Sequence, residues 1–232
     1  MNVIVCVKQI PDPANPGALD PSTNTLKRDG KLILDESDSY GVEMALQLVD
    51  KAGGGEVTLV SMAPNGEVSG LRTALAMGAA KGVLVSDPAL QGSDALTTAK
   101  VLAAAIKRAG DADLIIAATE SSDGYTGTVP EMIAEVLGLP SITFAKHLAI
   151  TEGKLDAQRQ TEEGYDDVTC PLPCVVSASE PCSAGSLTST PLAAPIASAV
   201  RRPETSPLGA IDTSVTSPPP ALSTSCSAIS TP

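Results

Sequence analysis

ADLIIAATESSDGYTGTVPEMIAEVL (residues 112–137) has the pattern of a short apolar strand, then a loop with two glycines, then an amphipathic helix. Apolar runs of this length that alternate with helical patterns are typical of a parallel sheet covered on both faces. Pro130 suits the first turn of the helix, because its missing N–H is not needed there. The stretch therefore predicts a strand–loop–helix unit of an α/β protein, with the loop at the carboxyl end of the strand.

The same alternation recurs through the first 145 residues. The expected strands cover 2–8, 56–62, 82–87, 112–119 and 141–145. The expected helices cover 37–51, 67–77, 94–109 and 128–137. This order predicts a doubly wound parallel sheet.

Three segments depart from the alternation. Residues 11–34 are rich in turn residues and predict a small hairpin around Asp29 and Gly30. Residues 148–179 contain strands joined by turns, which we expect to form an added strand pair crossing the edge of the sheet. In residues 181–232, Ser, Thr and Pro account for 27 of 52 positions and only four are charged, so burial cannot offset the entropy of ordering. We therefore expect a folded domain over 1–180 and a disordered or loosely attached tail over 181–232.

Composition excludes several classes of function. The net charge is −12 and aromatic residues make up 2% of the chain, which argues against a nucleic-acid binder. No apolar run approaches the roughly 20 residues of a membrane helix, and the N-terminal run has the pattern of a first strand and not of a signal peptide. We therefore expect a cytoplasmic protein without membrane insertion. Five scattered cysteines and a single histidine, His147, do not make a four-ligand zinc set, so no metal site is expected.

The loop after residue 119 is the first candidate for ligand binding. Ligands of doubly wound sheets bind outside the carboxyl ends of the strands, where a helix N-terminus offers free N–H groups to a phosphate. Gly124 and Gly127 let the backbone approach a ligand closely, and Thr126 or Thr128 can cap the helix. The alternative is an ordinary capped loop. Neither GxGxxG nor GxxxxGKS occurs, so a dinucleotide fingerprint and a P-loop are not supported.

A helix start and a strand end are weaker candidates. Asp35, Glu36, Ser37 and Asp38 open the first helix, where helix capping is the alternative to a ligand role. The end of the second long strand, 61–63, lies beside Cys6 if the two strands are neighbours. His147 has no partner base in the pattern, and the carboxylates of 161–167 fit an exposed acidic turn, so no catalytic residues are expected.

Five segments together resemble the beta subunit of electron transfer flavoproteins. They are VCVKQIPDP, YGVEMALQL, LRTALAMGAAKGVLV, ESSDGYTGTVPEMIAEVLGLP and AQRQTEEGYDDVTCPLPCVVS. The last is similar to the family signature, with Arg159, then an acidic cluster closed by Gly164, then Pro173 and two valines. Asp166 and Ser177 depart from the residues usual at their positions. The resemblance covers about residues 1–180.

The resemblance implies a nucleotide-binding fold of the Rossmann-like, adenine nucleotide alpha hydrolase-like kind that holds AMP or, in electron-bifurcating relatives, a second FAD. It also implies a heterodimer whose alpha subunit carries the redox-active FAD. Carried over by position, the cofactor-binding residues are Cys6, Asp35, Glu36, Ser37, Asp38, Met62, Ala117, Glu120, Ser121, Ser122, Asp123, Gly124, Tyr125, Thr126, Gly127 and Thr128.

The implied role is electron carriage from flavin dehydrogenases, such as the acyl-CoA dehydrogenases of fatty acid oxidation, to a membrane quinone oxidoreductase. Such a chain needs no catalytic residues of its own. The alternative from another class is a free-standing nucleotide-binding module similar to the universal stress proteins. After Ser179 the EPRY-like loop and lysine-rich segment of the family are replaced by EPCSAGSLTSTPLAAP, which either a frameshift or genuine divergence explains.

Overall fold

A computed structural model describes residues 1–15, 17–28, 30–179 and 211–215 of the chain. The elements follow one another as β1 (Asn2–Cys6), β2 (Gln9–Pro11), β3 (Leu32–Leu34), α1 (Glu36–Lys51), β4 (Glu56–Met62), α2 (Ser69–Ala76), β5 (Lys81–Val85), the 3₁₀ helix η1 (Pro88–Leu90), α3 (Ala95–Ala109), β6 (Leu114–Ala118), α4 (Val129–Leu137), β7 (Ser141–Thr151), β8 (Lys154–Gln160), β9 (Tyr165–Pro171), β10 (Cys174–Ala178) and β11 (Ile211–Val215).

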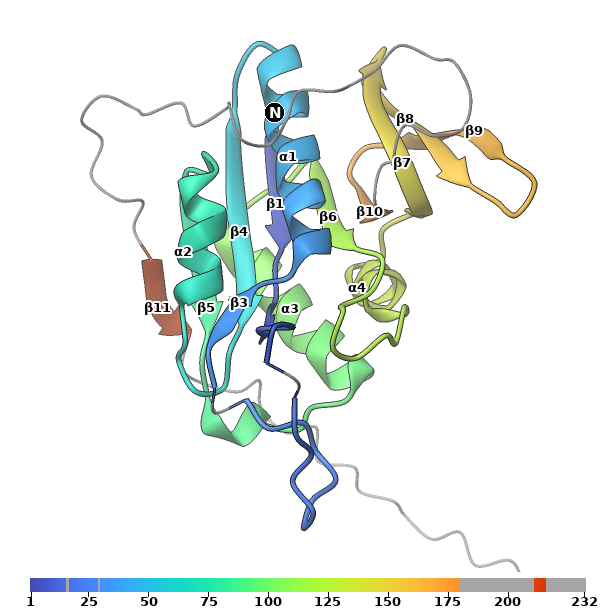
Figure 1. Cartoon of the computed structure of the whole chain (residues 1–232). Coiled ribbons are helices and arrows are strands. Elements are labelled where there is room, and N and C mark those ends of the chain that lie inside the picture. Colours follow the sequence, from blue (N-terminus) through green and yellow to red (C-terminus); the bar gives the residue numbers. More distant parts are fainter. Residues whose placement is uncertain (16, 29, 180–210, 216–232) are drawn as a thin grey trace, which may run out of the picture.

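One large sheet organises the molecule (Figure 1). Its strand order is β11-β5-β4-β1-β6-β10-β7-β8-β9. The strands from β11 to β7 run parallel, whereas β8 and β9 add to the far edge in antiparallel pairing. The predicted doubly wound α/β fold with added edge strands is therefore confirmed.

Alternate residues of β1 bury their side chains on opposite faces of this sheet. Val3 and Val5 join the cluster packed under α1 and α2, which lie in front of the sheet in Figure 1. Ile4 and Cys6 join the cluster formed with α3 and α4 on the other face. A central strand that is apolar on both faces needs helices on both sides, because either face would otherwise expose its side chains to water. The short apolar strands thus determine the two-sided covering.

Two strands near residue 170 differ from the expectation. β10 is not part of an edge pair but lies between β6 and β7 inside the parallel sheet. The side chains of Val175 and Val176 are fully buried, as an interior parallel strand requires. The segment 161–167 is only in part a turn, because β9 begins at Tyr165 and pairs with β8 through Asp166 and Asp167.

The chain between β2 and β3 forms an arm that projects from the body of the molecule (Figure 1). An isolated antiparallel bridge joins Leu19 to Leu26, and the turn between them is closed by Asp20, whose carboxylate accepts from the Ser22 N–H at 2.8 Å. The turn of the arm therefore lies several residues before the hairpin expected at Asp29 and Gly30, because an aspartate that bonds the backbone two residues on stabilises a turn by itself. Asp29 is outside the described residues.

The expected tail over 181–232 lies outside the described residues except for β11. This strand runs parallel to β5 and pairs Ile211 with Gly82. The expectation of a disordered or loosely attached tail stays a prediction.

Candidate functional site

The carboxyl ends of β1 and β6 lie side by side at the centre of the sheet. Cys6 pairs with Ala117, and the side chains of both are buried. The next strand outward on the other side of β1 is β4, where Val60 pairs with Cys6 and Met62 lies two residues further on. Three predicted positions from three segments of the chain therefore meet at the same edge of the sheet.

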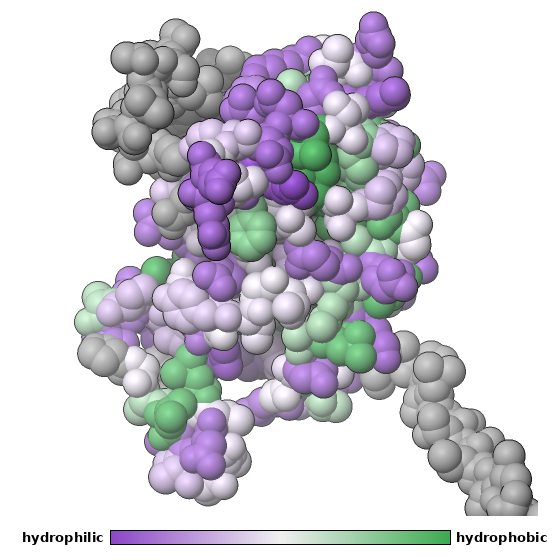
Figure 2. Space-filling view, turned by 90° about the vertical axis from the view of Figure 1, so that its right-hand side faces the viewer, coloured by the Kyte–Doolittle hydropathy of each residue, from purple (hydrophilic) through white to green (hydrophobic). Residues whose placement is uncertain are grey.

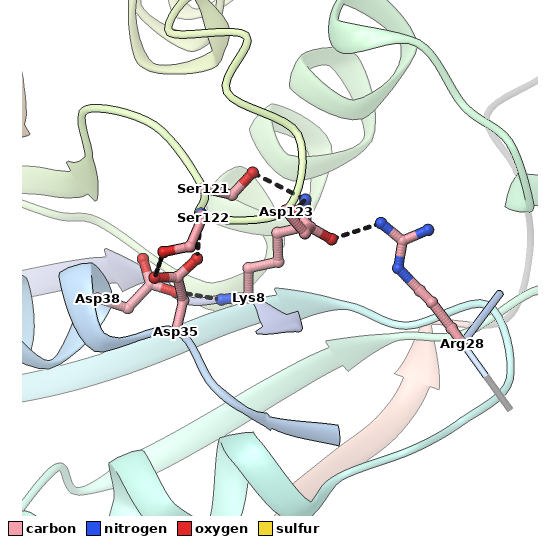
Figure 3. A network of polar contacts seen from close by, with 7 residues as sticks. All are labelled: Lys8, Arg28, Asp35, Asp38, Ser121, Ser122 and Asp123. Atoms are coloured by element: carbon pink, nitrogen blue, oxygen red, sulfur yellow. Dashed lines mark hydrogen bonds and ion pairs between the residues drawn. The ribbon is translucent and has the colours of Figure 1, made fainter. Parts of the chain in front are cut away.

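Asp35 fastens the loop after β6 to the start of α1 (Figure 3). Its carboxylate accepts from the N–H of Ser122 at 2.7 Å and from the Ser122 hydroxyl at 2.8 Å. It also caps α1 by accepting from the N–H of Ser37 at 3.2 Å. Asp35 is fully buried, so these three donors satisfy a carboxylate that water does not reach. The geometry assigns Asp35 to capping and to holding the loop.

Asp38 lies one turn further into α1 and is also buried. Its carboxylate accepts from the backbone N–H of Lys8 at 2.6 Å. Burial raises the pKa of Asp38 well above its usual value, and the charges of Asp35 and Asp123 add to this, although the Lys8 N–H and ammonium oppose it. Burial likewise raises the pKa of the Cys6 thiol to about 12, with a further contribution from the Asp38 charge. Burial therefore disfavours the charged form of both side chains.

Asp123 lies between two cations (Figure 3). Its carboxylate contacts the Lys8 ammonium at 2.5 Å and the Arg28 guanidinium at 2.5 Å, and its side chain is only 5% exposed. Burial would raise the pKa of Asp123, but the hydrogen bonds and charges of Lys8 and Arg28 outweigh it and lower the pKa. Lys8 also donates to the Ser121 hydroxyl at 2.9 Å. Both cations therefore lie beside the first part of the loop, paired with the Asp123 carboxylate.

The two ends of the loop differ in their surroundings. A methyl group added to Gly124 would lie 3.8 Å from the Lys8 ammonium, whereas one added to Gly127 would lie 3.6 Å from a carboxylate oxygen of Glu120. The N–H groups of Gly124 and Tyr125 bond back to the Ser121 carbonyl. Within the described part of the chain, no acceptor is recorded for the N–H groups of residues 126–128. The N–H groups open to a ligand therefore lie near Gly127, and the cations lie near Gly124.

Two residues of the loop have a positive φ, Gly127 as expected and Tyr125 unexpectedly. Gly127 has φ +60°, which glycine adopts without penalty. Tyr125 has φ +47° and its side chain is 67% exposed. The expected hydroxyl cap is not formed at Thr128, which begins α4 without a side-chain hydrogen bond. The helix start therefore keeps its N–H groups open.

The remaining predicted residues surround this centre at different depths. Ser37, Met62, Ser121, Ser122 and Gly127 are half-buried. Glu36, Glu120, Gly124, Tyr125, Thr126 and Thr128 are exposed. Sequence reasoning missed Lys8 and Arg28 as members of the cluster. The available signal was that both are basic residues in an acidic chain, and that Lys8 is the last residue of the first expected strand.

The other features that the sequence singled out lie elsewhere. His147 is exposed on β7 and pairs with Gln158 of β8. Among the described residues, no group of three histidine, cysteine or carboxylate side chains could hold a metal ion. None of the described helices is long and apolar enough to span a membrane.

Comparison with known proteins matches residues 23–199 to the electron transfer flavoprotein domain. The electron transfer flavoprotein subunit beta of Mycobacterium tuberculosis (H37Rv) is 38% identical over 184 residues, which cover 77% of this chain and 69% of that protein. The caffeyl-CoA reductase-Etf complex subunit CarD of Acetobacterium woodii is 38% identical over 178 residues, covering 76% and 68%. The beta subunit of Megasphaera elsdenii is 38% identical over 185 residues, covering 77% and 68%.

Proposed function

This chain belongs to the electron transfer flavoprotein beta-subunit family, and we propose that it pairs with an alpha subunit and binds an adenine nucleotide at the loop after β6. Membership of this family implies electron transfer and a flavin-bearing partner. It also favours this role over the free-standing stress-protein module, the alternative that the sequence left open. In the proposed complex the nucleotide has a structural role, and the redox-active FAD is held mainly by the alpha subunit.

One observation carries the nucleotide proposal: open N–H groups at residues 126–128 and the cations Lys8 and Arg28 share one loop at the carboxyl edge of a parallel sheet. A phosphate is stabilised by both kinds of group. Cys6 and Ala117 form a small, apolar floor beside them, which suits a base or ribose better than a charged group. The residues present therefore fit an adenine nucleotide with its phosphate toward the loop.

The nucleotide itself is AMP or a second FAD. The relative from Acetobacterium woodii is named as a subunit of a caffeyl-CoA reductase-Etf complex, which supports electron exchange with enzymes of CoA esters. We place the complex in the cytoplasm, between flavin dehydrogenases such as acyl-CoA dehydrogenases and a membrane quinone oxidoreductase. The role of this chain is to hold the nucleotide and to position the alpha subunit. We therefore expect no turnover of acyl-CoA or NADH by the isolated chain.

Mass spectrometry of nucleotide released from the co-purified heterodimer tests the proposal. We expect AMP or FAD from the wild type. Arg28→Ala removes one cation beside Asp123 and should lower the affinity for the nucleotide by about tenfold or more, since a charged hydrogen bond contributes roughly 1.5–3 kcal/mol.

Lys31→Ala is the matched control, because Lys31 belongs to the same arm but pairs with Asp12 at 3.0 Å. Melting temperatures of both variants separate a binding defect from a folding defect. A heterodimer without an adenine nucleotide, or an Arg28→Ala variant with wild-type occupancy, would refute the proposed site.

A further inference from the structure

A second surface feature lies beside the loop after β6 and is acidic. It is a pocket of about 480 Å³ between α4 and β7, bounded by Glu131, Met132, Glu135, Thr143 and Phe144, with Gly127 at one end. We call it the α4–β7 pocket. None of the residues that line it is Lys, Arg or His. Two carboxylates without a cation do not suit a phosphate, so the pocket differs in chemistry from the cluster around Asp123.

The backbone turns Phe144 outward into this pocket. Phe144 has φ +54°, a conformation uncommon for an aromatic residue. Its N–H donates to the hydroxyl of the buried Ser177 at 3.0 Å, where the register between β7 and β10 shifts. The only phenylalanine of the chain is consequently 47% exposed. Irregularities of this kind often re-aim a side chain at a binding site.

Glu131 brings an unsatisfied charge to the same pocket. Its Oε2 is buried, and the described residues supply no hydrogen-bond partner for it. Glu135 follows one turn later on α4, so both carboxylates lie on one side of the helix. A buried carboxylate oxygen without a donor is unfavourable, so a donor from outside the described chain would be bound strongly.

We propose that the α4–β7 pocket receives an arginine side chain of the alpha subunit; this inference rests on the proposed heterodimer. A guanidinium can bond a carboxylate with two parallel N–H groups and lie on the face of an aromatic ring. Glu131 and Phe144 provide these two partners in one pocket. A lysine ammonium would meet the charge but not the planar geometry.

The surface around the α4–β7 pocket favours a partner protein that binds through a few anchoring side chains. Viewed from the side of α4 and β7, the surface is largely polar, and its apolar side chains form small separate areas (Figure 2). Besides Phe144 of β7, Val136 of α4 is an exposed apolar residue. A few anchors in a polar surface are typical of interface hot spots, in which arginine is frequent. A second copy of this chain fits less well, because two chains of net charge −12 repel one another.

The test measures the dissociation constant between this chain and the purified alpha subunit. Glu131→Gln keeps the shape of the side chain but removes its charge, and we expect the dissociation constant to rise at least about tenfold. Phe144→Ala should weaken binding similarly, mainly through faster dissociation. Glu43→Gln makes the same charge change on the exposed face of α1, where Glu43 accepts a hydrogen bond from Gln47, and should leave binding unchanged. Circular dichroism confirms that each variant is folded.

A photoreactive phenylalanine analogue at position 144 identifies what occupies the pocket. We expect a crosslink to an arginine-containing peptide of the alpha subunit. Wild-type binding by both Glu131→Gln and Phe144→Ala, or a crosslink to a peptide without arginine or within this chain, would overturn the pocket but leave the heterodimer standing. A wild-type chain that binds no alpha subunit would overturn both proposals.

Discussion

Asp38 and Asp123 are carboxylates of one cluster whose pKa values move in opposite directions. Asp38 is buried with one backbone donor and two acidic neighbours, so its pKa is raised. Asp123 is held by two cations that outweigh its burial, so its pKa is lowered. An ionised aspartate therefore opposes folding at position 38 and supports it at position 123. The two contributions to stability depend on pH in opposite ways.

Asp38→Asn should stabilise the protein at neutral pH. A raised pKa means that the contribution of Asp38 to stability is fully present below the unfolded-state pKa near 3.8 and is lost as pH rises through the folded-state pKa. Asparagine keeps an acceptor for the Lys8 N–H without the charge. We expect a melting temperature a few degrees higher at pH 7–8, or about 1–2 kcal/mol, with the difference closing toward pH 4.

Thermal unfolding across this pH range measures the effect. Asp50→Asn is the control, because Asp50 is an exposed residue of the same helix and should give no such pH dependence. A variant less stable than wild type at pH 8 would contradict the buried-charge argument.

Asp123→Asn should have the opposite dependence on pH. A lowered pKa means that the stabilisation by Asp123 is present above the unfolded-state pKa of 3.8 and is lost as pH falls through the folded-state pKa. We expect a loss of about 1–3 kcal/mol at pH 7, because Lys8 and Arg28 lose their common partner. The loss should fade in acid.

Urea titrations at pH 7 and pH 3 compare the two states. Asp166→Asn removes the more exposed ion pair with Arg159, at 2.7 Å, and should change stability little. Equal effects at both pH values would show that the Asp123 carboxylate does not act through its charge.

The site could be predicted from sequence only in part, because some of its residues follow local patterns and others are distant in the sequence. The glycines and the helix start of the loop are local patterns, and Gly127 has the positive φ that such a glycine suggests. Lys8 and Arg28 are 115 and 95 residues away from Asp123. Nothing local to either cation indicates that partner, because the pairing of β1 with β6 brings Lys8 to the loop and the arm between β2 and β3 brings Arg28.

At the level of elements, α2 is positioned by a clamp from β2. The buried Gln9 accepts from the N–H of Gly70 at 2.7 Å and donates to the carbonyl of Glu67. Gly70 packs closely here, since an added methyl group would lie 2.6 Å from Cγ of Gln9 and 3.1 Å from backbone atoms of Leu34. The first turn of α2 therefore requires a residue without a side chain.

Gly70→Ala should lower the stability by about 1–3 kcal/mol, because neither the hydrogen-bonded Gln9 nor the Leu34 backbone can move freely. This corresponds to a melting temperature lower by roughly 2–12 °C for a chain of this size. Gly30→Ala is the control, because nothing lies within 4 Å of a methyl group there. Equal melting temperatures for the two variants would contradict the clamp.

The elements themselves were largely predictable, and the exceptions have physical causes. The short apolar strands and amphipathic helices of the first 145 residues follow their local pattern. β10 was placed wrongly because its apolar run predicts a buried strand but carries no information on which neighbours it inserts between. β9 was missed because its exposed edge position allows charged residues, which resemble a turn in sequence.

For the whole molecule, removal of residues 181–232 should leave the melting temperature within about 3 °C, or roughly 1 kcal/mol. The segment has nine prolines, and its Leu, Val and Ile residues are scattered without a helix or strand period, so they offer no continuous apolar face to bury. Chains ending at 180 and at 215 separate the contribution of β11, which pairs with β5. A melting temperature much lower for the chain ending at 180 than for the chain ending at 215 would show that β11 is a stabilising strand. Resistance of residues 181–232 to limited proteolysis would contradict the disordered tail.

The long-range contacts of the cluster also have a consequence for biosynthesis. Ser122 bonds Asp35 across 87 residues, and Asp123 bonds Lys8 across 115. During translation, β1, the arm and α1 leave the ribosome long before the loop that completes the cluster. The Lys8 ammonium and the Asp35 carboxylate therefore lack their partners from the loop until β6 has been made and has joined β1. The nucleotide that we propose at this loop would therefore stabilise the nascent chain only after that step, late in folding.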